Sequence, residues 1–142
     1  MKTTLSDSDT GISGIYEMDG CLIVPIQEEI DNRKAADLSS RVLGFLEQHA
    51  LKLVLIDLSA VSVLDRKTFQ VILTTASMIS LMGAGTVFVG IQPGVASALV
   101  DLDVEIQGMQ TAFSIREGIN LLKEIDINGG YKIQSKNEIN EN

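Results

Sequence analysis

Cysteine, histidine and tryptophan are nearly missing from this sequence of 142 residues, which has one cysteine, one histidine and no tryptophan. The single cysteine, Cys21, excludes an intramolecular disulfide, and its position in an apolar stretch predicts a buried thiol in a reducing cytosol. The one histidine, His49, stands at the end of a helical pattern, where packing or capping is expected rather than general-base catalysis. No catalytic triad and no cluster of metal ligands can be assembled, so we expect no enzymatic activity, no cofactor and no bound metal.

Positive charge and long apolar runs are also scarce. The chain has 11 lysines and arginines against 19 acidic residues, and its formal net charge of −8 repels nucleic-acid phosphates and anionic membranes. No apolar run approaches the roughly 20 residues of a membrane helix. Residues 1–13 are polar and do not resemble a signal peptide. We therefore expect a soluble cytoplasmic protein that binds neither nucleic acid nor membranes.

The chain does contain enough apolar material for one core. Hydrophobic residues make up 45% of the sequence, which is ordinary for a packed globular domain, and the length suits one domain rather than two. The two ends are polar and cannot bury enough surface to offset their ordering entropy. We predict a flexible tail over 1–12, one domain over 13–127 and a flexible polar tail over 128–142.

Five stretches have the pattern of β-strands. The dipeptide Asp19-Gly20, typical of tight hairpin turns, joins the first two, and the later apolar runs are rich in Val and Ile, as buried strands are. The last stretch is short enough for an edge strand. The predicted strands cover Ile15 to Met18, Cys21 to Gln27, Lys52 to Asp57, Gly85 to Ile91 and Gln110 to Ala112.

Four helical patterns lie between and after these strands. The first two begin directly after Asp31 and Asp65, which suit N-caps, and the second ends at Gly83. Pro93 fits the first turn of the third helix, and a capping box at Ser114 opens the fourth. The apolar side of the third helix is expected to be Ala96, Leu99 and Val100. Core packing is the default for Met78, Leu81 and Met82, with an exposed apolar patch as the alternative.

The alternation of strands and helices predicts an α/β fold with right-handed crossovers. The leading hairpin makes the sheet mixed, while the inner strands are expected to be parallel. We therefore predict a small, mixed, mostly parallel sheet flanked by about four helices.

The most informative stretch runs from Ile56 to Arg66, where a buried strand gives way to a Ser-rich turn and then to a helix capped by Asp65. A helix start presents unpaired backbone N–H groups and the positive end of the helix dipole. Such a place suits an anion or a partner protein. We expect the functional surface here.

Together with three other segments, this stretch resembles the STAS family, the domain of anti-sigma-factor antagonists. The other segments are Cys21 to Gln27, Leu81 to Gly85 and Gly90 to Ala96, and the resemblance extends from about Ile15 to Lys123. It implies a STAS-type fold of the architecture predicted above. It also implies an antagonist or scaffold subunit in stress signalling that captures a switch kinase and assembles with other STAS proteins in a stressosome.

The resemblance also locates a switch. In stressosome antagonists of this family a Ser or Thr follows the acidic residue, and its phosphorylation by the captured kinase releases that kinase. Here the position holds Arg66, followed by Lys67, and a helix start disfavours each of these cations by about 0.3–1 kcal/mol. Three interpretations stay open: a solvated surface, partner binding without phospho-control, or a neighbouring acceptor. The candidate acceptors are Thr68, Ser62 and Ser59, and the expected partner-binding residues are Ser62, Asp65, Arg66, Lys67 and Thr68.

A second function, from a different class, also stays open. The turn after the strand at Gly85 to Ile91 lies at the sheet edge where open α/β folds commonly bind ligands. A ligand-sensing STAS module would bind a small anion, a lipid or a nucleotide there, in a pocket formed by Gln92, Pro93, Gly94 and Val95. An enzyme ranks third, because the usual catalytic groups are lacking.

Overall fold

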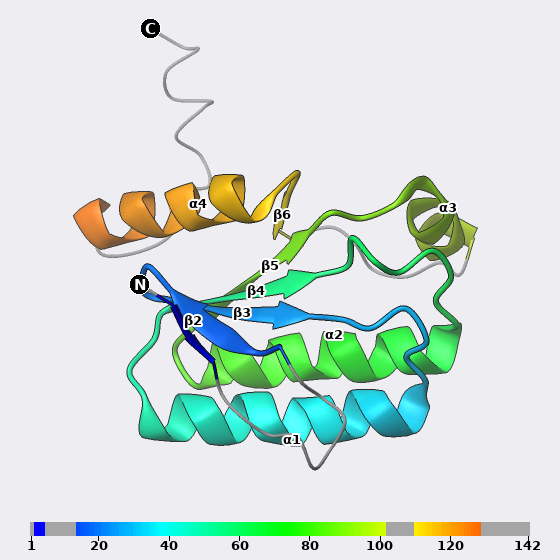
Figure 1. Cartoon of the computed structure of the whole chain (residues 1–142), viewed down its shortest axis with the longest axis horizontal. Coiled ribbons are helices and arrows are strands. Elements are labelled where there is room, and N and C mark those ends of the chain that lie inside the picture. Colours follow the sequence, from blue (N-terminus) through cyan, green and yellow to red (C-terminus); the bar gives the residue numbers. More distant parts are fainter. Residues whose placement is uncertain (1, 5–13, 102–109, 129–142) are drawn as a thin grey trace, which may run out of the picture.

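The computed structural model describes residues 2–4, 14–101 and 110–128. Within these residues six strands form one sheet in chain order, and four helices pack around it (Figure 1). The strands are β1 (Lys2–Thr4), β2 (Tyr16–Met18), β3 (Cys21–Pro25), β4 (Leu53–Asp57), β5 (Gly85–Val89) and β6 (Gln110–Ala112). The helices are α1 (Asn32–Gln48), α2 (Arg66–Leu81), α3 (Pro93–Asp101) and α4 (Ile115–Asn128).

The sheet is mixed and mostly parallel, which confirms the predicted fold class. Strand β2 pairs antiparallel with β1 and with β3, whereas β3, β4, β5 and β6 are parallel. The carboxyl ends of these four parallel strands, and the loops that lead from them into the four helices, therefore share one edge of the sheet. We call it the carboxyl edge.

The two faces of the sheet are covered by different helices. Figure 1 shows α1 and α2 on one face and α4 on the other. Alternate strand residues supply the two cores: Leu22 and Phe88 belong to the core that includes α1 and α2, while Ile23 and Leu55 belong to the core with α4. Each buried side chain of this size contributes about 1.5–3 kcal/mol of transfer free energy. Burial on both faces explains why the inner strands read as continuous apolar runs.

The helices begin and end at the capping residues that the sequence indicated. Asp31 caps α1 by accepting a hydrogen bond from the Lys34 backbone N–H at 2.8 Å. Helix α2 ends before Gly83, whose φ of +94° reverses the chain so that the Ala84 N–H reaches the Ile79 carbonyl at 3.2 Å. These are the predicted boundaries, because each depends only on residues close in sequence.

Sequence prediction missed one strand and extended two others. The short strand β1 lies inside the segment predicted as a flexible tail over 1–12, and its pairing with β2 has no signal in the local pattern. Strand β3 ends at Pro25 rather than Gln27, and β5 ends at Val89 rather than Ile91 because Gly90 turns with φ of +71°. The predicted C-terminal tail over 128–142 lies outside the described residues, except for Asn128, the last residue of α4.

Two apolar assignments differ from the structure. In α3 the residues facing the core are Val95 and Leu99, while Ala96 is exposed and Val100 is 67% exposed, because α3 contributes only one narrow stripe to the core. Near the end of α2, Met78, Leu81 and Met82 are all exposed, so default core packing was wrong and the alternative of an exposed patch is correct.

Candidate partner-binding surface

The start of α2 is fixed by Asp65. Its side chain accepts a hydrogen bond from the Thr68 backbone N–H at 2.8 Å, and its own carbonyl accepts the Phe69 N–H at 3.0 Å. The Thr68 backbone N–H, first among several causes, holds the pKa of the Asp65 carboxyl below its ordinary value, and Lys67 adds a weaker coulombic effect. The predicted N-cap is confirmed.

The loop between β4 and α2 is anchored by every third side chain. Leu58, Val61 and Leu64 are buried, whereas Ser59, Ser62 and Val63 between them are exposed. Asp57, at the end of β4, accepts hydrogen bonds from the Ser59 backbone N–H at 3.0 Å and the Ser59 hydroxyl at 2.7 Å. The loop is therefore held in one conformation with its polar side outward.

The turn between β5 and α3 supports this loop from the side. The Gln92 side chain donates a hydrogen bond to the Ser59 carbonyl at 2.6 Å. Gly90 lies so close that a Cβ on it would be 2.8 Å from the Ser59 Cβ, and a Cβ on Gly94 would be 2.9 Å from the Ser62 carbonyl oxygen. The two regions that the sequence suggested as separate sites thus form one continuous surface on the carboxyl edge.

The two cations at the helix start point to solvent. Arg66 and Lys67 are both exposed, and neither forms an ion pair with another described residue. The Asp65 carboxylate gives Lys67 only a weak coulombic attraction at a helix end that disfavours cations. Their charges are therefore available to a partner.

The three candidate acceptors differ in access. Thr68 is fully buried, and its hydroxyl oxygen lies near the Asp65 carboxylate without a well-formed hydrogen bond. Ser59 is exposed, but its hydroxyl is engaged by Asp57. Ser62 is exposed on the loop. Access therefore reverses the predicted order and puts Ser62 ahead of Thr68.

The residues proposed for a ligand pocket are mainly used in packing. The Gln92 amide N–H donates to the Ser59 carbonyl, and Val95 is buried in the core shared with α1 and α2. Pro93 and Gly94 are exposed. These contacts give the ligand-sensing alternative no support of its own.

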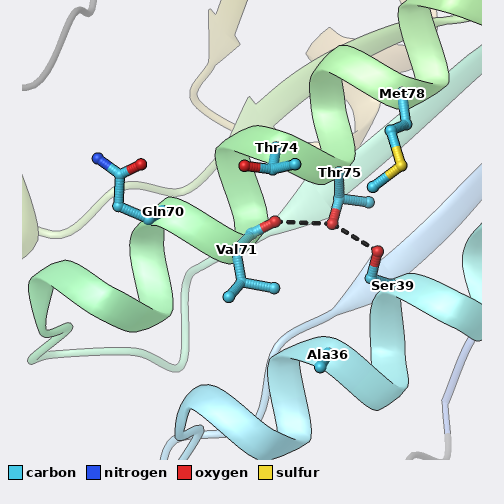
Figure 2. A pocket seen from close by; sticks show the side chains of 7 residues that line it. All are labelled: Ala36, Ser39, Gln70, Val71, Thr74, Thr75 and Met78. Atoms are coloured by element: carbon cyan, nitrogen blue, oxygen red, sulfur yellow. Dashed lines mark hydrogen bonds between the residues drawn. The ribbon is translucent and has the colours of Figure 1, made fainter.

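A groove that sequence reasoning missed lies between α1 and α2 (Figure 2). It has a volume of about 330 Å³ and is lined by Ala36, Ser39, Gln70, Val71, Thr74, Thr75 and Met78. At its floor the Thr75 hydroxyl lies 2.7 Å from the Ser39 hydroxyl and 2.7 Å from the Val71 carbonyl oxygen. Two hydroxyl residues at buried helical positions were the available sequence signal.

The residues that could have carried other chemistry have structural roles. Cys21 is buried in strand β3, as predicted, and His49 caps the end of α1, with its ring stacked on Phe45 at a centroid distance of 3.9 Å. Over the described ranges, no three His, Cys, Asp or Glu side chains gather as metal ligands. Within the same ranges, no helix combines the length and apolar character needed to cross a bilayer.

The family model for the STAS domain matches residues 14–112. This chain belongs to the STAS domain family. The match spans the sheet from β2 to β6 and includes both loops of the surface described above. The predicted family resemblance is therefore confirmed.

Two curated STAS relatives come from Bacillus subtilis (strain 168). RsbT co-antagonist protein RsbRA is 26% identical over 124 residues, covering 87% of this chain and 44% of the relative. RsbT co-antagonist protein RsbRD is 27% identical over 116 residues, covering 82% of this chain and 39% of the relative. This STAS chain thus spans less than half the length of these two relatives.

Two solved structures are similar over nearly their whole length. A serine-to-glutamate variant of RsbS from Moorella thermoacetica is 28% identical with a TM-score of 0.72, covering 80% of this chain and 97% of that one. A chain from a structure of the stressosome, a signal integration and transduction hub, is 27% identical with a TM-score of 0.71. The match covers 80% of this chain and 98% of that one. Both support the STAS fold of this chain.

Proposed function

We propose that this chain is a non-enzymatic STAS antagonist or scaffold subunit in cytoplasmic stress signalling. It binds an RsbT-like switch kinase and RsbR-like STAS proteins, in a large assembly of the stressosome type. The surface it uses is the β4–α2 loop and the first turn of α2, with Ser62, Asp65, Arg66 and Lys67. Thr68, which was also predicted to bind the partner, is fully buried and contributes only to the cap. The names of its relatives, RsbT co-antagonists and RsbS, support this class of partner.

The observation that carries the proposal is the rigid support of an exposed helix start. Asp65 caps the helix, Gln92 and Gly94 hold the preceding loop, and Arg66 and Lys67 stand exposed beside it. A surface that is ordered before binding loses less conformational entropy when a partner docks. Such preorganisation is expected of a docking surface and is not needed in a solvated loop.

Arg66 occupies the position of the family's phosphorylated hydroxyl in this proposal. An arginine does not have the hydroxyl that a kinase phosphorylates. Modification at that residue therefore cannot release the bound kinase. The protein then acts as a constitutive antagonist or scaffold. If control by phosphate is retained, Ser62 is the acceptor best exposed on the same surface.

Affinity purification from the protein's own cells, with and without stress, tests the partners and the modification together. Mass spectrometry is expected to identify a switch kinase and other STAS proteins, with no phosphate on the chain. Phosphate on Ser62 that rises with stress as the kinase is lost would mean that the switch has moved. Recovery of neither a kinase nor a STAS protein in either condition would refute the proposal.

Substitutions at Arg66 test its role directly. The unmodified protein should hold the recombinant kinase equally well with and without ATP. Arg66→Ser should make binding sensitive to ATP, because it provides a hydroxyl at the helix start, and Arg66→Glu should weaken binding without ATP. Leu81→Ala, exposed at the other end of α2, is the control. Unchanged binding in both Arg66 variants would argue against this surface.

A further inference from the structure

An exposed aromatic side chain stands on the same edge as the start of α2. Phe113 follows β6 and is 91% exposed, and Val63, in the β4–α2 loop, is 79% exposed. Neither was among the residues expected from sequence to bind a partner. Exposed aromatic residues are characteristic anchors of protein–protein contacts.

Contacts across three strands link the residue before Phe113 to the loop that carries Val63. The Gly90 N–H donates to the carbonyl of Ala112, the residue before Phe113, at 3.2 Å, and Gly90 in turn lies against Ser59. Neighbouring strands are about 4.8 Å apart, so the ends of β4 and β6 are separated by roughly 10 Å. That span fits within a standard interface of about 800 Å² per partner.

The backbone around Phe113 is held in place. Its N–H donates to the Glu117 carboxylate at 2.6 Å, and the Glu117 N–H donates to the Ser114 hydroxyl at 3.2 Å. The exposed ring therefore projects from a capped helix start, as Val63 and Arg66 do from the capped start of α2. Fixed backbone lowers the entropy lost when the ring enters a partner.

Charge indicates what kind of partner fits. The chain has a formal net charge of −8, yet Arg66 and Lys67 are adjacent, exposed and without an ion pair among the described residues. The nearest carboxylates in sequence are engaged: Asp65 caps α2 and Asp57 accepts from Ser59. An acidic partner is repelled by the protein as a whole and attracted at this pair, which orients its approach.

We infer that the docking surface extends across the carboxyl edge to Phe113 and receives an acidic protein surface with an apolar pocket. Phe113 enters the pocket with Val63 as a smaller second anchor, and Arg66 and Lys67 face carboxylates at its rim. This inference rests on the proposed function, that a switch kinase binds at this edge. It adds the anchor and the chemistry of the partner.

The test uses the full chain and the recombinant switch kinase of its own host. Phe113→Ala should weaken binding at least about 30-fold, as for an aromatic hot spot, with no change in thermal unfolding. Leu81→Ala is the matched control, since that side chain is 88% exposed at the opposite edge, and it should leave binding unchanged. Equal affinity of Phe113→Ala and Leu81→Ala would overturn the anchor.

The charge contribution is measured in the association rate. The rate should fall between about 50 mM and about 500 mM salt, and a protein with both Arg66→Glu and Lys67→Glu should associate more slowly with a weaker salt dependence. Lys52→Glu, an exposed position at the opposite edge, should keep the original salt dependence. Binding that persists with an association rate independent of salt and of Arg66 overturns the inference but leaves the proposed function standing. No binding to the kinase overturns both.

Discussion

Helices α1 and α2 begin side by side on the carboxyl edge with the same cap but different surroundings. In each an aspartate accepts the backbone N–H three residues ahead at 2.8 Å: Lys34 onto Asp31, and Thr68 onto Asp65. At the start of α1, Lys34 Nζ donates to the Glu29 carbonyl of the same segment at 3.3 Å. The start of α2 rests on a turn more than 20 residues further along the chain.

The difference shows that the cap starts a helix, whereas other contacts order the surface beside the helix start. Both caps satisfy the same orphan N–H groups and are worth about 1 kcal/mol each. Before α1 the contact from outside is a backbone bond at the end of β3, from the Ile26 N–H to the Asp57 carbonyl at 2.9 Å. Before α2 a second loop packs against both Ser59 and Ser62, which leaves an ordered, exposed surface on the side where Arg66 and Lys67 stand. The packing of the β5–α3 turn against the loop, rather than the cap, is what distinguishes the proposed docking helix from its neighbour.

The largest effect is expected from removing this support at Gly90. Gly90→Ala adds a Cβ at 2.8 Å from the Ser59 Cβ and 3.2 Å from its Cα, in a backbone with φ of +71°. Left-handed strain of about 1–2 kcal/mol and overpacking of about 1–3 kcal/mol should together lower the free energy of unfolding by about 3 kcal/mol. Urea denaturation measures the loss, and partner binding should fall as well because the loop shifts.

Gly83 provides the matched control for Gly90. Its φ is +94°, but a Cβ there would meet nothing within 4 Å. Gly83→Ala should therefore cost only the conformational strain, about 1–2 kcal/mol, and leave binding intact. Equal destabilisation by the two substitutions would show that the contact with Ser59 adds nothing to the support of the loop.

The second effect concerns the hydroxyl pair that joins the two helices in Figure 2. Thr75→Val leaves the Ser39 hydroxyl at 9% exposure without the partner that lies 2.7 Å away. An unsatisfied buried hydroxyl costs about 1–3 kcal/mol, whereas removing both hydroxyls together is nearly neutral. Thr75→Val should lower the free energy of unfolding by about 1.5 kcal/mol, and adding Ser39→Ala should recover part of that loss.

This pair tests whether stability and binding are separable in α2. Thr75 faces α1, away from the carboxyl edge, so the kinase affinity of Thr75→Val should match that of the unchanged protein at a temperature where both are folded. A parallel loss of binding would mean that the α1–α2 contact, and not the β5–α3 turn, positions the docking surface. Additive effects of the two substitutions would contradict the coupling of the hydroxyls.

The sequence was sufficient wherever structure depends on near neighbours. Asp31, Asp65 and Gly83 each define a helix end through bonds to residues three to five positions away, and these ends were predicted. The alternation of apolar strands and helices likewise predicted the sheet. Local pattern could not predict strand β1, whose only described pairing is with β2, because pairing partners are set by the assembled sheet.

The candidate site was predicted in part for the same reason. Asp65 and its exposed neighbours follow from a strand, a turn and a cap in succession. The contact of Gly90 and Gln92 with Ser59 joins segments 31 and 33 residues apart, so the sequence suggested two sites where the structure has one. The burial of Thr68 and the exposure of Phe113 are also tertiary outcomes, since each depends on which elements pack nearby.

A smaller effect should come from removing either cap. Asp31→Ala and Asp65→Ala should each lower the free energy of unfolding by about 1 kcal/mol, because each leaves an N–H of the first turn without its acceptor. Chemical denaturation should give similar losses for the two variants. Partner binding should separate them, since only Asp65→Ala frays the turn that carries Arg66 and Lys67. Equal loss of binding in both variants would contradict the assignment of the docking surface to the start of α2 rather than to that of α1.

The smallest effect is the pH dependence of the Asp65 cap. Hydrogen bonding, chiefly from the Thr68 N–H, lowers the pKa of this carboxyl in the folded protein relative to the unfolded chain. Its contribution to stability is therefore fully present above the unfolded pKa near 3.9, and it is lost as the pH falls through the lower folded value.

Asp65→Asn keeps a capping oxygen that does not titrate, so between about pH 5 and about pH 2 it should lose slightly less stability than the unchanged protein. Because the carboxylate is exposed, solvent screening keeps the difference small. Urea midpoints measured across this range for both proteins test this prediction. If the two curves of midpoint against pH stay parallel down to about pH 2, the carboxylate caps α2 by geometry alone, with no contribution from its charge.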